Sequence, residues 1–152
     1  MLPTPTKFSL VAGCGEADNK LNAFDNALLE AGIGNLNLLK VSSIMPPGAK
    51  QVENLKIPPG SLVPTAYGSI YSDIPGEVIA AAVAIGFSED TFGVIMEFSG
   101  KCTKEEAEET VREMVRDAFR QRGMRLVDIK SKAIDHKVEK VGCSFAAVAL
   151  WY

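Results

Sequence analysis

Cysteine and histidine are scarce in this sequence, and their scarcity excludes several kinds of site. The three cysteines, Cys14, Cys102 and Cys143, lie far apart and form no C-x-x-C pair, so we expect neither a disulfide framework nor a zinc cluster. His136 is the one histidine and lies in a charged stretch, which favours a surface position on a strand. A histidine-dependent triad elsewhere in the chain is excluded, and no metal site is predicted.

The chain also lacks an excess of positive charge and a long apolar run. Its 16 Lys and Arg residues are interspersed among 19 Asp and Glu residues, so there is no basic stripe for nucleic acid. The longest strongly apolar run, 78–85, is far shorter than the ~20 residues of a membrane-spanning helix. The N-terminus has no secretory signal pattern. We therefore expect a cytoplasmic protein with neither a nucleic-acid nor a membrane partner.

The sequence does contain enough apolar material for one hydrophobic core. Of its 152 residues, 47% are hydrophobic and 23% are charged, which is near the usual composition of a globular domain. A chain of this length fits one domain, here 1–152. We find no internal repeat, low-complexity tract or linker that would divide it.

Apolar spacing predicts two helices. Residues at three- and four-residue intervals predict a helix at about 22–31, which Gly32 ends. Thr103 and Glu106 form a capping box, and an amphipathic pattern continues from them over 104–122. The second helix is the clearest local signal in the chain.

About six or seven strands account for most of the remaining chain. The predicted strands cover residues 7–12, 35–42, 62–72, 77–87, 92–99, 124–138 and 144–151. The alanine content of 77–87 leaves a helix open there, and the proline-rich stretch 46–60 is expected to be a loop that joins no ladder. Because strands outnumber helices and do not alternate with them, the pattern favours an α+β layered domain over a doubly wound parallel sheet.

Ser42 and Ser43 stand at the end of a predicted buried strand. Pro46 and Pro47 follow closely and restrain the chain, which favours a strained bond between the two serines. If the Ser43 hydroxyl attacks the carbonyl of Ser42, the amide becomes an ester. Elimination across Ser43 then leaves a dehydroalanine, and hydrolysis yields a pyruvoyl group. This chemistry also requires an oxyanion site and a base, which the residues alone leave open.

The sequence around the serine pair, together with other blocks of the chain, indicates a particular family. The region around the pair reads LNAFDNALLEAGIGNLNLLKVSSIMPP and resembles the self-cleavage region of the pyruvoyl-dependent arginine decarboxylase family. Four further blocks resemble that family in the same order: LVPTAYGSIYSDIPGE, GVIMEFSGKC, EEAEETVREM and VEKVGCSFAAVALWY. The resemblance covers nearly the whole chain.

The resemblance implies a self-processing enzyme with an αββα sandwich of mainly antiparallel sheet. Cleavage would give a β chain of residues 1–42 and an α chain of residues 43–152, with a covalent pyruvoyl cofactor formed from Ser43. In the family this group forms a Schiff base with arginine and draws off the electrons freed when carbon dioxide leaves, giving agmatine. A homo-oligomer is also implied, a trimer or a dimer of trimers, with active sites between subunits.

The resemblance assigns roles to individual residues. Glu97 matches the acid that returns a proton to the decarboxylated carbon, although an exposed strand carboxylate is the ordinary alternative. Asn37 matches an asparagine that polarises the scissile carbonyl or holds the pyruvoyl group. Asp25 matches the carboxylate that binds the substrate guanidinium, with backbone acceptors at Gly34 and Leu36.

Two alternatives stay open at this point. The first is a pyruvoyl-dependent decarboxylase of another amino acid, because pocket residues decide the substrate while the self-cleavage logic is shared. The second is a non-catalytic, unprocessed relative that keeps the fold.

Overall fold

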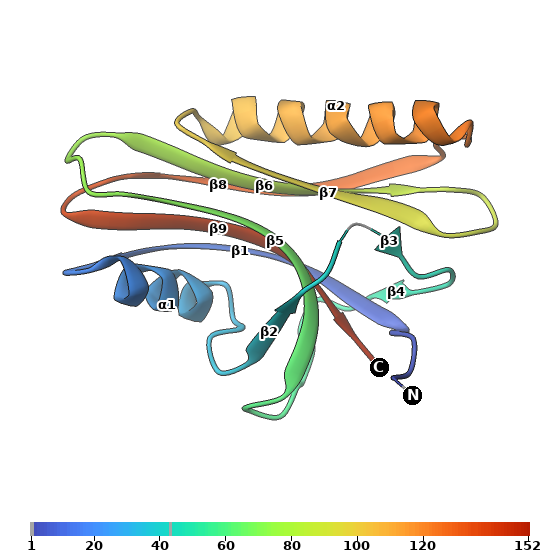
Figure 1. The fold of residues 1–152 in the computed structure, drawn as a ribbon, viewed down its shortest axis with the longest axis horizontal. Helices are drawn as coiled ribbons and strands as arrows, with labels where there is room; N and C mark the ends of the chain where they lie inside the picture. Colours follow the sequence, from blue (N-terminus) through green and yellow to red (C-terminus); the bar gives the residue numbers. More distant parts are fainter. Residues whose placement is uncertain (1, 43) are drawn as a thin grey trace.

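Two β-sheets lie face to face, and a helix covers the outer face of each (Figure 1). This computed structural model describes residues 2–42 and 44–152. The first sheet has the order β2 (Asn37–Lys40), β5 (Leu62–Ser72), β9 (Val141–Trp151), β1 (Lys7–Ala17) and β4 (Lys50–Gln51). The second has the order β3 (Ile44–Met45), β7 (Gly93–Gly100), β6 (Val78–Phe87) and β8 (Asp128–Lys137).

The four layers confirm the αββα sandwich. Helix α1 (Lys20–Glu30) packs on the first sheet and α2 (Lys104–Arg122) packs on the second, as Figure 1 shows. The central pairs β1–β9, β5–β9, β6–β7 and β6–β8 are antiparallel, and β1–β4 and β2–β5 are parallel. Among the described residues, no helix is long and apolar enough to cross a bilayer.

The central strands read as almost continuous apolar runs because both of their faces are covered. Along β9, Phe145 and Ala147 face α1, while Ala146 and Val148 face the second sheet. Strand β6 is buried in the same two-sided way, and this explains the alanine-rich sequence that left a helix open. Small side chains let the layers approach each other closely.

Glycines on β1 let α1 rest directly on the strand backbone. A Cβ added at Gly13 would lie 2.3 Å from the carbonyl oxygen of Ala27, and one at Gly15 would lie 2.5 Å from that of Ala23. The sequence had suggested that these glycines end the first strand at residue 12. The strand instead continues to Ala17, because the glycines serve packing between layers and do not form a turn.

Other element predictions hold with small corrections. Helix α2 has the predicted bounds and the capping box of Thr103 and Glu106. Helix α1 begins two residues earlier than predicted, where the Asn19 side chain accepts a hydrogen bond from the Asn22 N–H. The prediction that the proline-rich stretch 46–60 joins no sheet is wrong. Strand β4 lies within it and pairs with the start of β1, with Lys50 opposite Lys7.

His136 is not an ordinary surface residue. Its side chain is 18% exposed, and its Nε2 lies 2.6 Å from Oε2 of Glu16, so the pair joins β8 of the second sheet to β1 of the first. Glu16 also accepts hydrogen bonds from the backbone N–H groups of Glu139 and Lys140. Burial raises the pKa of the Glu16 carboxyl, but these hydrogen bonds outweigh it and hold that pKa below its usual value.

Candidate active site

The chain passes from one sheet to the other at the predicted cleavage bond. Just before it, the Val41 N–H donates to the carbonyl of Thr65 in the first sheet (3.1 Å). Just after it, β3 pairs with β7 of the second sheet, with Ile44 opposite Val94. Ser43 itself lies outside the described residues. The segment is therefore fixed to a different sheet on each side of the predicted cut.

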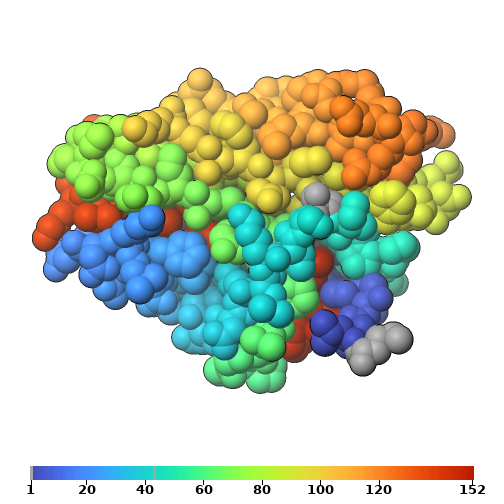
Figure 2. All heavy atoms as spheres, in the orientation of Figure 1, coloured from blue at the N-terminus to red at the C-terminus, as the bar shows by residue number. Residues whose placement is uncertain are grey.

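Core packing fixes the two flanks of this crossing. Met45 is 2% exposed and Val41 packs against the same cluster between the sheets. A Cβ added at Gly93 would lie 3.2 Å from the Cβ of Met45, so β3 lies tightly on β7. In Figure 2 the chain on either side of the predicted cut, light blue to turquoise, lies to the right of α1 (blue) and below the second sheet (yellow). The crossing is held at the open edge of the sandwich.

Glu97 faces the space between the sheets near this crossing. It lies on β7, three residues beyond Val94, which is roughly 10 Å along the strand at about 3.3 Å per residue. Its side chain is partly buried and faces Gly68 of β5, where an added Cβ would lie 3.4 Å from the Cβ of Glu97. Because Gly68 has no side chain, β5 lies close to the Glu97 side chain.

The environment of Glu97 favours the protonated acid. Burial raises the pKa of the Glu97 carboxyl, and the positive charge of Lys40 lowers it by less. The net pKa is above the usual value for Glu, which suits a group that must hold and then donate a proton.

Asn37 lies away from the crossing of its own chain. Its Nδ2 donates to the carbonyl of Gly60 (2.9 Å), and its backbone N–H donates to the carbonyl of Ser61 (2.9 Å). Four residues of extended chain separate it from Val41, which is roughly 13 Å. Its amide therefore faces the connection between β4 and β5.

Asp25 is exposed on the flank of α1 that points away from β1. The opposite flank is bonded to β1, where the Asn26 Nδ2 donates to the carbonyl of Glu16 (2.9 Å). Leu29, about 6 Å further along the helix, packs on Gly34, where an added Cβ would lie 2.6 Å from the Leu29 Cδ2. Asp25 and Gly34 thus lie on the same side of the molecule.

Gly34 and Leu36 line a small cavity of about 200 Å³ beneath this flank. Leu36 also packs in the cluster between α1 and the first sheet. The predicted site residues therefore form two groups. Ser42 precedes the crossing and Glu97 lies on β7, the strand that pairs with the chain just after it, whereas Asp25, Gly34, Leu36 and Asn37 lie on and beside the segment from α1 to β2.

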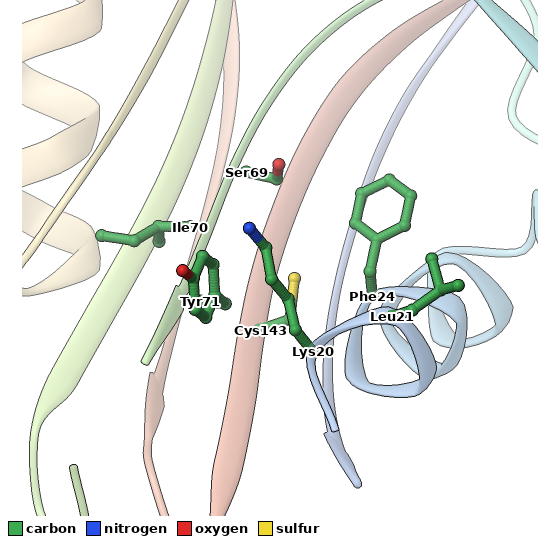
Figure 3. A pocket seen from close by; sticks show the side chains of 7 residues that line it. All are labelled: Lys20, Leu21, Phe24, Ser69, Ile70, Tyr71 and Cys143. Carbon is green, nitrogen blue, oxygen red and sulfur yellow. The ribbon is translucent and has the colours of Figure 1, made fainter. Parts of the chain in front are cut away.

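A larger pocket opens between α1 and the first sheet. It has a volume of about 480 Å³ and is lined by Lys20, Leu21, Phe24, Ser69, Ile70, Tyr71 and Cys143 (Figure 3). The Lys20 ammonium lies 3.8 Å from the centroid of the Tyr71 ring. Burial raises the pKa of the Cys143 thiol to about 11, so this thiol stays protonated and is a poor nucleophile. Leu21 belongs to both this pocket and the flank of Asp25, because the two residues are four apart on the helix.

The model of the pyruvoyl-dependent arginine decarboxylase family matches residues 7–152, which is nearly the whole chain. The chain belongs to this family. It is 57% identical over 150 residues to the pyruvoyl-dependent arginine decarboxylase of Methanocaldococcus jannaschii, covering 97% of this chain and 91% of the relative. It is 47% identical over 152 residues to the enzyme of that name from Pyrococcus abyssi, covering 97% of this chain and 96% of the relative.

Membership in the pyruvoyl-dependent arginine decarboxylase family gives the chain a covalently bound pyruvoyl cofactor. The surroundings of the crossing fit such a group, because the segment is anchored on both sides and the strand that pairs with it carries the partly buried acid Glu97. Among residues 2–42 and 44–152, no cluster of three or more His, Cys, Asp or Glu side chains gathers for a metal ion.

Proposed function

We propose that this protein decarboxylates L-arginine to agmatine and carbon dioxide, after cutting itself into a β chain of residues 1–42 and an α chain of residues 43–152. The observation that carries the proposal is the crossing between sheets at the serine pair, close to a partly buried Glu97. Ser43 is the source of the cofactor in this proposal. The family relationship supports both the cofactor and arginine as the substrate.

The bound pyruvoyl group supplies a ketone that accepts the substrate amine and an electron sink for the bond that breaks. The side chains supply the remaining functions. Glu97 donates a proton to the carbon that has lost carbon dioxide, and its raised pKa keeps that proton available at higher pH than an ordinary Glu. Limited access of water to the space between the sheets reduces competing protonation.

Asp25 binds the guanidinium group of arginine. A carboxylate and a guanidinium form two parallel charge-assisted hydrogen bonds, and an exposed Asp25 is free to make them. Leu21 and Leu29 flank Asp25 one helical turn away on each side, with exposures of 75% and 50%. They offer apolar surface for the methylene chain of the substrate. The backbone carbonyls at Gly34 and Leu36 act as further acceptors.

We also propose that the active site is shared between two copies of the chain in a trimer or a dimer of trimers. Within one chain the first sheet separates α1, which carries Asp25, from the space that Glu97 faces. Three exposed apolar residues lie on the elements that carry or flank the two groups of predicted site residues. They are Leu29 on α1, Leu39 on β2 and Ile44 on β3, each 42–50% exposed. Exposed apolar residues clustered at one edge are typical of an interface.

In this arrangement Asn37 also acts on a neighbouring copy. Its amide is too far along β2 to reach its own crossing, so it polarises the carbonyl or holds the pyruvoyl group of the adjacent subunit. Light scattering of the purified protein is expected to give a mass of three or six chains. An active monomer would contradict the shared site.

Mass spectrometry and an assay of agmatine test the main proposal. The denatured protein is expected to give two fragments, one ending at Ser42 and one starting with a pyruvoyl group in place of Ser43. The Ser43→Ala variant should stay intact and inactive. An intact chain that still decarboxylates arginine would refute the proposed cofactor.

A panel of amino acids tests the substrate. Release of carbon dioxide from arginine should exceed release from lysine and ornithine, which lack the planar guanidinium. The Asp25→Asn variant should be cut normally yet lose most of its turnover of arginine. If that variant keeps full turnover of arginine, or if another amino acid is preferred, the assignment of arginine is wrong.

We place the enzyme in the cytoplasm. Cys14, Cys102 and Cys143 are all free thiols in the structure, as is usual in a reducing compartment. Cell fractionation should recover the protein and its agmatine-forming activity together in the cytoplasmic fraction.

A further inference from the structure

Strand β7 lies directly against β5 beside Glu97. A Cβ added at Gly68 would lie 3.4 Å from the Cβ of Glu97 and 3.5 Å from the backbone nitrogen and oxygen of Phe98. Ser99 follows two residues after Glu97, so both side chains lie on the face of β7 that carries the core residue Ile95. Glu97 and Ser99 therefore both face the first sheet.

Ser99 makes a hydrogen bond from one sheet to the other. Its hydroxyl donates to the backbone carbonyl of Ser69 on β5, with 3.1 Å between the two oxygens. This carbonyl lies on the edge of β5 where the Val41 N–H bonds the Thr65 carbonyl, because every second carbonyl of a strand points the same way. Since β2 ends at Lys40, opposite Thr65, its ladder stops before Ser69. Ser99 therefore gives the Ser69 carbonyl the hydrogen bond that the ladder with β2 does not provide.

We propose that Ser99 is a positioning residue for Glu97: its hydrogen bond holds β7 against β5 and so fixes where the Glu97 carboxyl group lies between the sheets. The inference rests on the proposed function and names a further residue for the same reaction. Ser99 keeps its own proton and does not touch the substrate. The proton moves from the Glu97 carboxyl to the carbon that has lost carbon dioxide, and water returns a proton to Glu97 before the next turnover.

Two physical effects make the position of Glu97 important. A general acid must lie within hydrogen-bond reach of the atom that it protonates, and a misplacement of about 1 Å can cost on the order of 100-fold in rate. Contact between β5 and β7 also keeps water from the carboxyl group, and this burial raises the pKa of Glu97. If the two strands separate, water solvates the carboxylate and the pKa falls toward its usual value.

The charges around Glu97 do not depend on Ser99. Strand β5 presents Gly68 to it, β6 pairs Val83 with it, and β9 adds Ala146 to the core cluster between the sheets. None of these three residues is charged. The charge that lowers the pKa of Glu97 is that of Lys40, on the α1 face of the first sheet. Removal of the Ser99 hydroxyl changes the contact between the strands and leaves these groups in place.

Steady-state kinetics on the processed enzyme test the proposal. The variants are Ser99→Ala, which removes the hydroxyl, and Ser99→Thr, which keeps it. The matched control is Ser88→Ala, since the partly buried Ser88 hydroxyl also donates to a backbone carbonyl, that of Phe92 (2.9 Å), in the turn that precedes β7. Fragment masses give the fraction cleaved in each sample, and kcat is normalised to that fraction.

We expect Ser99→Ala to lower kcat roughly fivefold or more, because the acid is no longer held in place, while the KM for arginine changes less than about twofold. Activity falls at high pH as Glu97 loses its proton, and this alkaline limb should move to lower pH in Ser99→Ala. Ser99→Thr and Ser88→Ala should both keep the wild-type profile.

Carbon NMR measures the same effect without catalysis. In the uncut Ser43→Ala protein with carboxyl-labelled glutamate, the Glu97 signal is assigned by its loss in Glu97→Gln. The pKa of Glu97 should fall when Ser99→Ala is added and stay unchanged when Ser88→Ala is added. This measurement decides the question even where Ser99→Ala slows the self-cleavage.

Either of two results overturns the proposal. One is a Ser99→Ala protein whose alkaline limb or Glu97 pKa matches that of the wild type, whatever its kcat. The other is an equal change in Ser88→Ala. Wild-type protein that is cut but releases no carbon dioxide from arginine refutes the proposed function instead, and the NMR titration still tests the role of Ser99.

Discussion

Mixing two inactive variants should restore activity if the active site spans two copies of the chain. Asp25 lies on α1, outside the first sheet, and Glu97 faces the space inside it. A chain with Asp25→Asn still supplies a working Glu97, and a chain with Glu97→Gln still supplies a working Asp25. In a mixed trimer, some sites therefore combine the two intact residues.

The fraction of activity that should return can be calculated for a ring of chains in which each active site lies between two neighbours. Each site takes Asp25 from one chain and Glu97 from the next, so an equal, random mixture gives four equally common pairings. One pairing has both intact residues, and about a quarter of the wild-type kcat/KM should return. Each variant alone should retain roughly 10% or less, because loss of a charge-assisted contact or of a general acid costs roughly 10- to 100-fold or more.

Co-expression of the two variants from separate plasmids provides the mixed oligomer. Agmatine formation is measured at arginine concentrations well below KM, so that the rate reports kcat/KM. The matched control mixes Glu97→Gln with Ser43→Ala. In our proposal the pyruvoyl group formed from Ser43 and the Glu97 that acts with it belong to one chain, so this mixture should show no recovery.

Two results would refute the reasoning. The first is no recovery from the Asp25→Asn and Glu97→Gln mixture in samples that mass spectrometry shows to contain both chains in one oligomer. The second is equal recovery in the control mixture. Either result would mean that the two groups of residues are not divided between neighbouring subunits as their places in the fold indicate.

Three further predictions concern the fold that holds the site. Glu16→Gln should lower the free energy of unfolding by about 2 kcal/mol at pH 7, because Glu16 accepts hydrogen bonds from His136 and from two backbone N–H groups. Since folding lowers the pKa of Glu16, its stabilisation is fully present above about pH 4.3, and denaturant titrations should show it disappearing as the pH falls through the folded-state pKa. Gly13→Ala should cost roughly 1–3 kcal/mol in the same assay, since its Cβ would collide with the carbonyl of Ala27, and an unchanged unfolding midpoint would contradict the close approach of α1. Thr103→Ala should cost about 1 kcal/mol through loss of the capping box, with agmatine formation unchanged at low temperature.

Local signals in the sequence were enough for several elements of the fold. Helix α2 was predicted with its bounds because its cap and its apolar face lie within a few residues of each other. Strand β5 was predicted with its bounds as well, since proline and glycine on either side limit it. The serine pair was recognised from its chemistry and its neighbours, and the family from blocks of sequence, because both are properties of adjacent residues.

The tertiary structure alone decided how distant residues meet. Glu16 and His136 are 120 residues apart, and neither shows in the sequence that it binds the other across the two sheets. The sequence predicted that the strand ends at the glycines of β1. It does not show that these glycines contact a helix in another layer, because that helix comes later in the chain. Strand β4 joined a ladder despite its proline-rich surroundings, since the open edge of β1 was available to it.

The same distinction applies to the site. The sequence by itself determined that a serine pair, an acid and an aspartate were present, because residue identity and local spacing carry that information. Only the fold placed Glu97 between the sheets and Asp25 on the outer side of α1. The physical reason is that charge, burial and separation depend on how layers stack, and stacking depends on contacts between residues that are far apart along the chain.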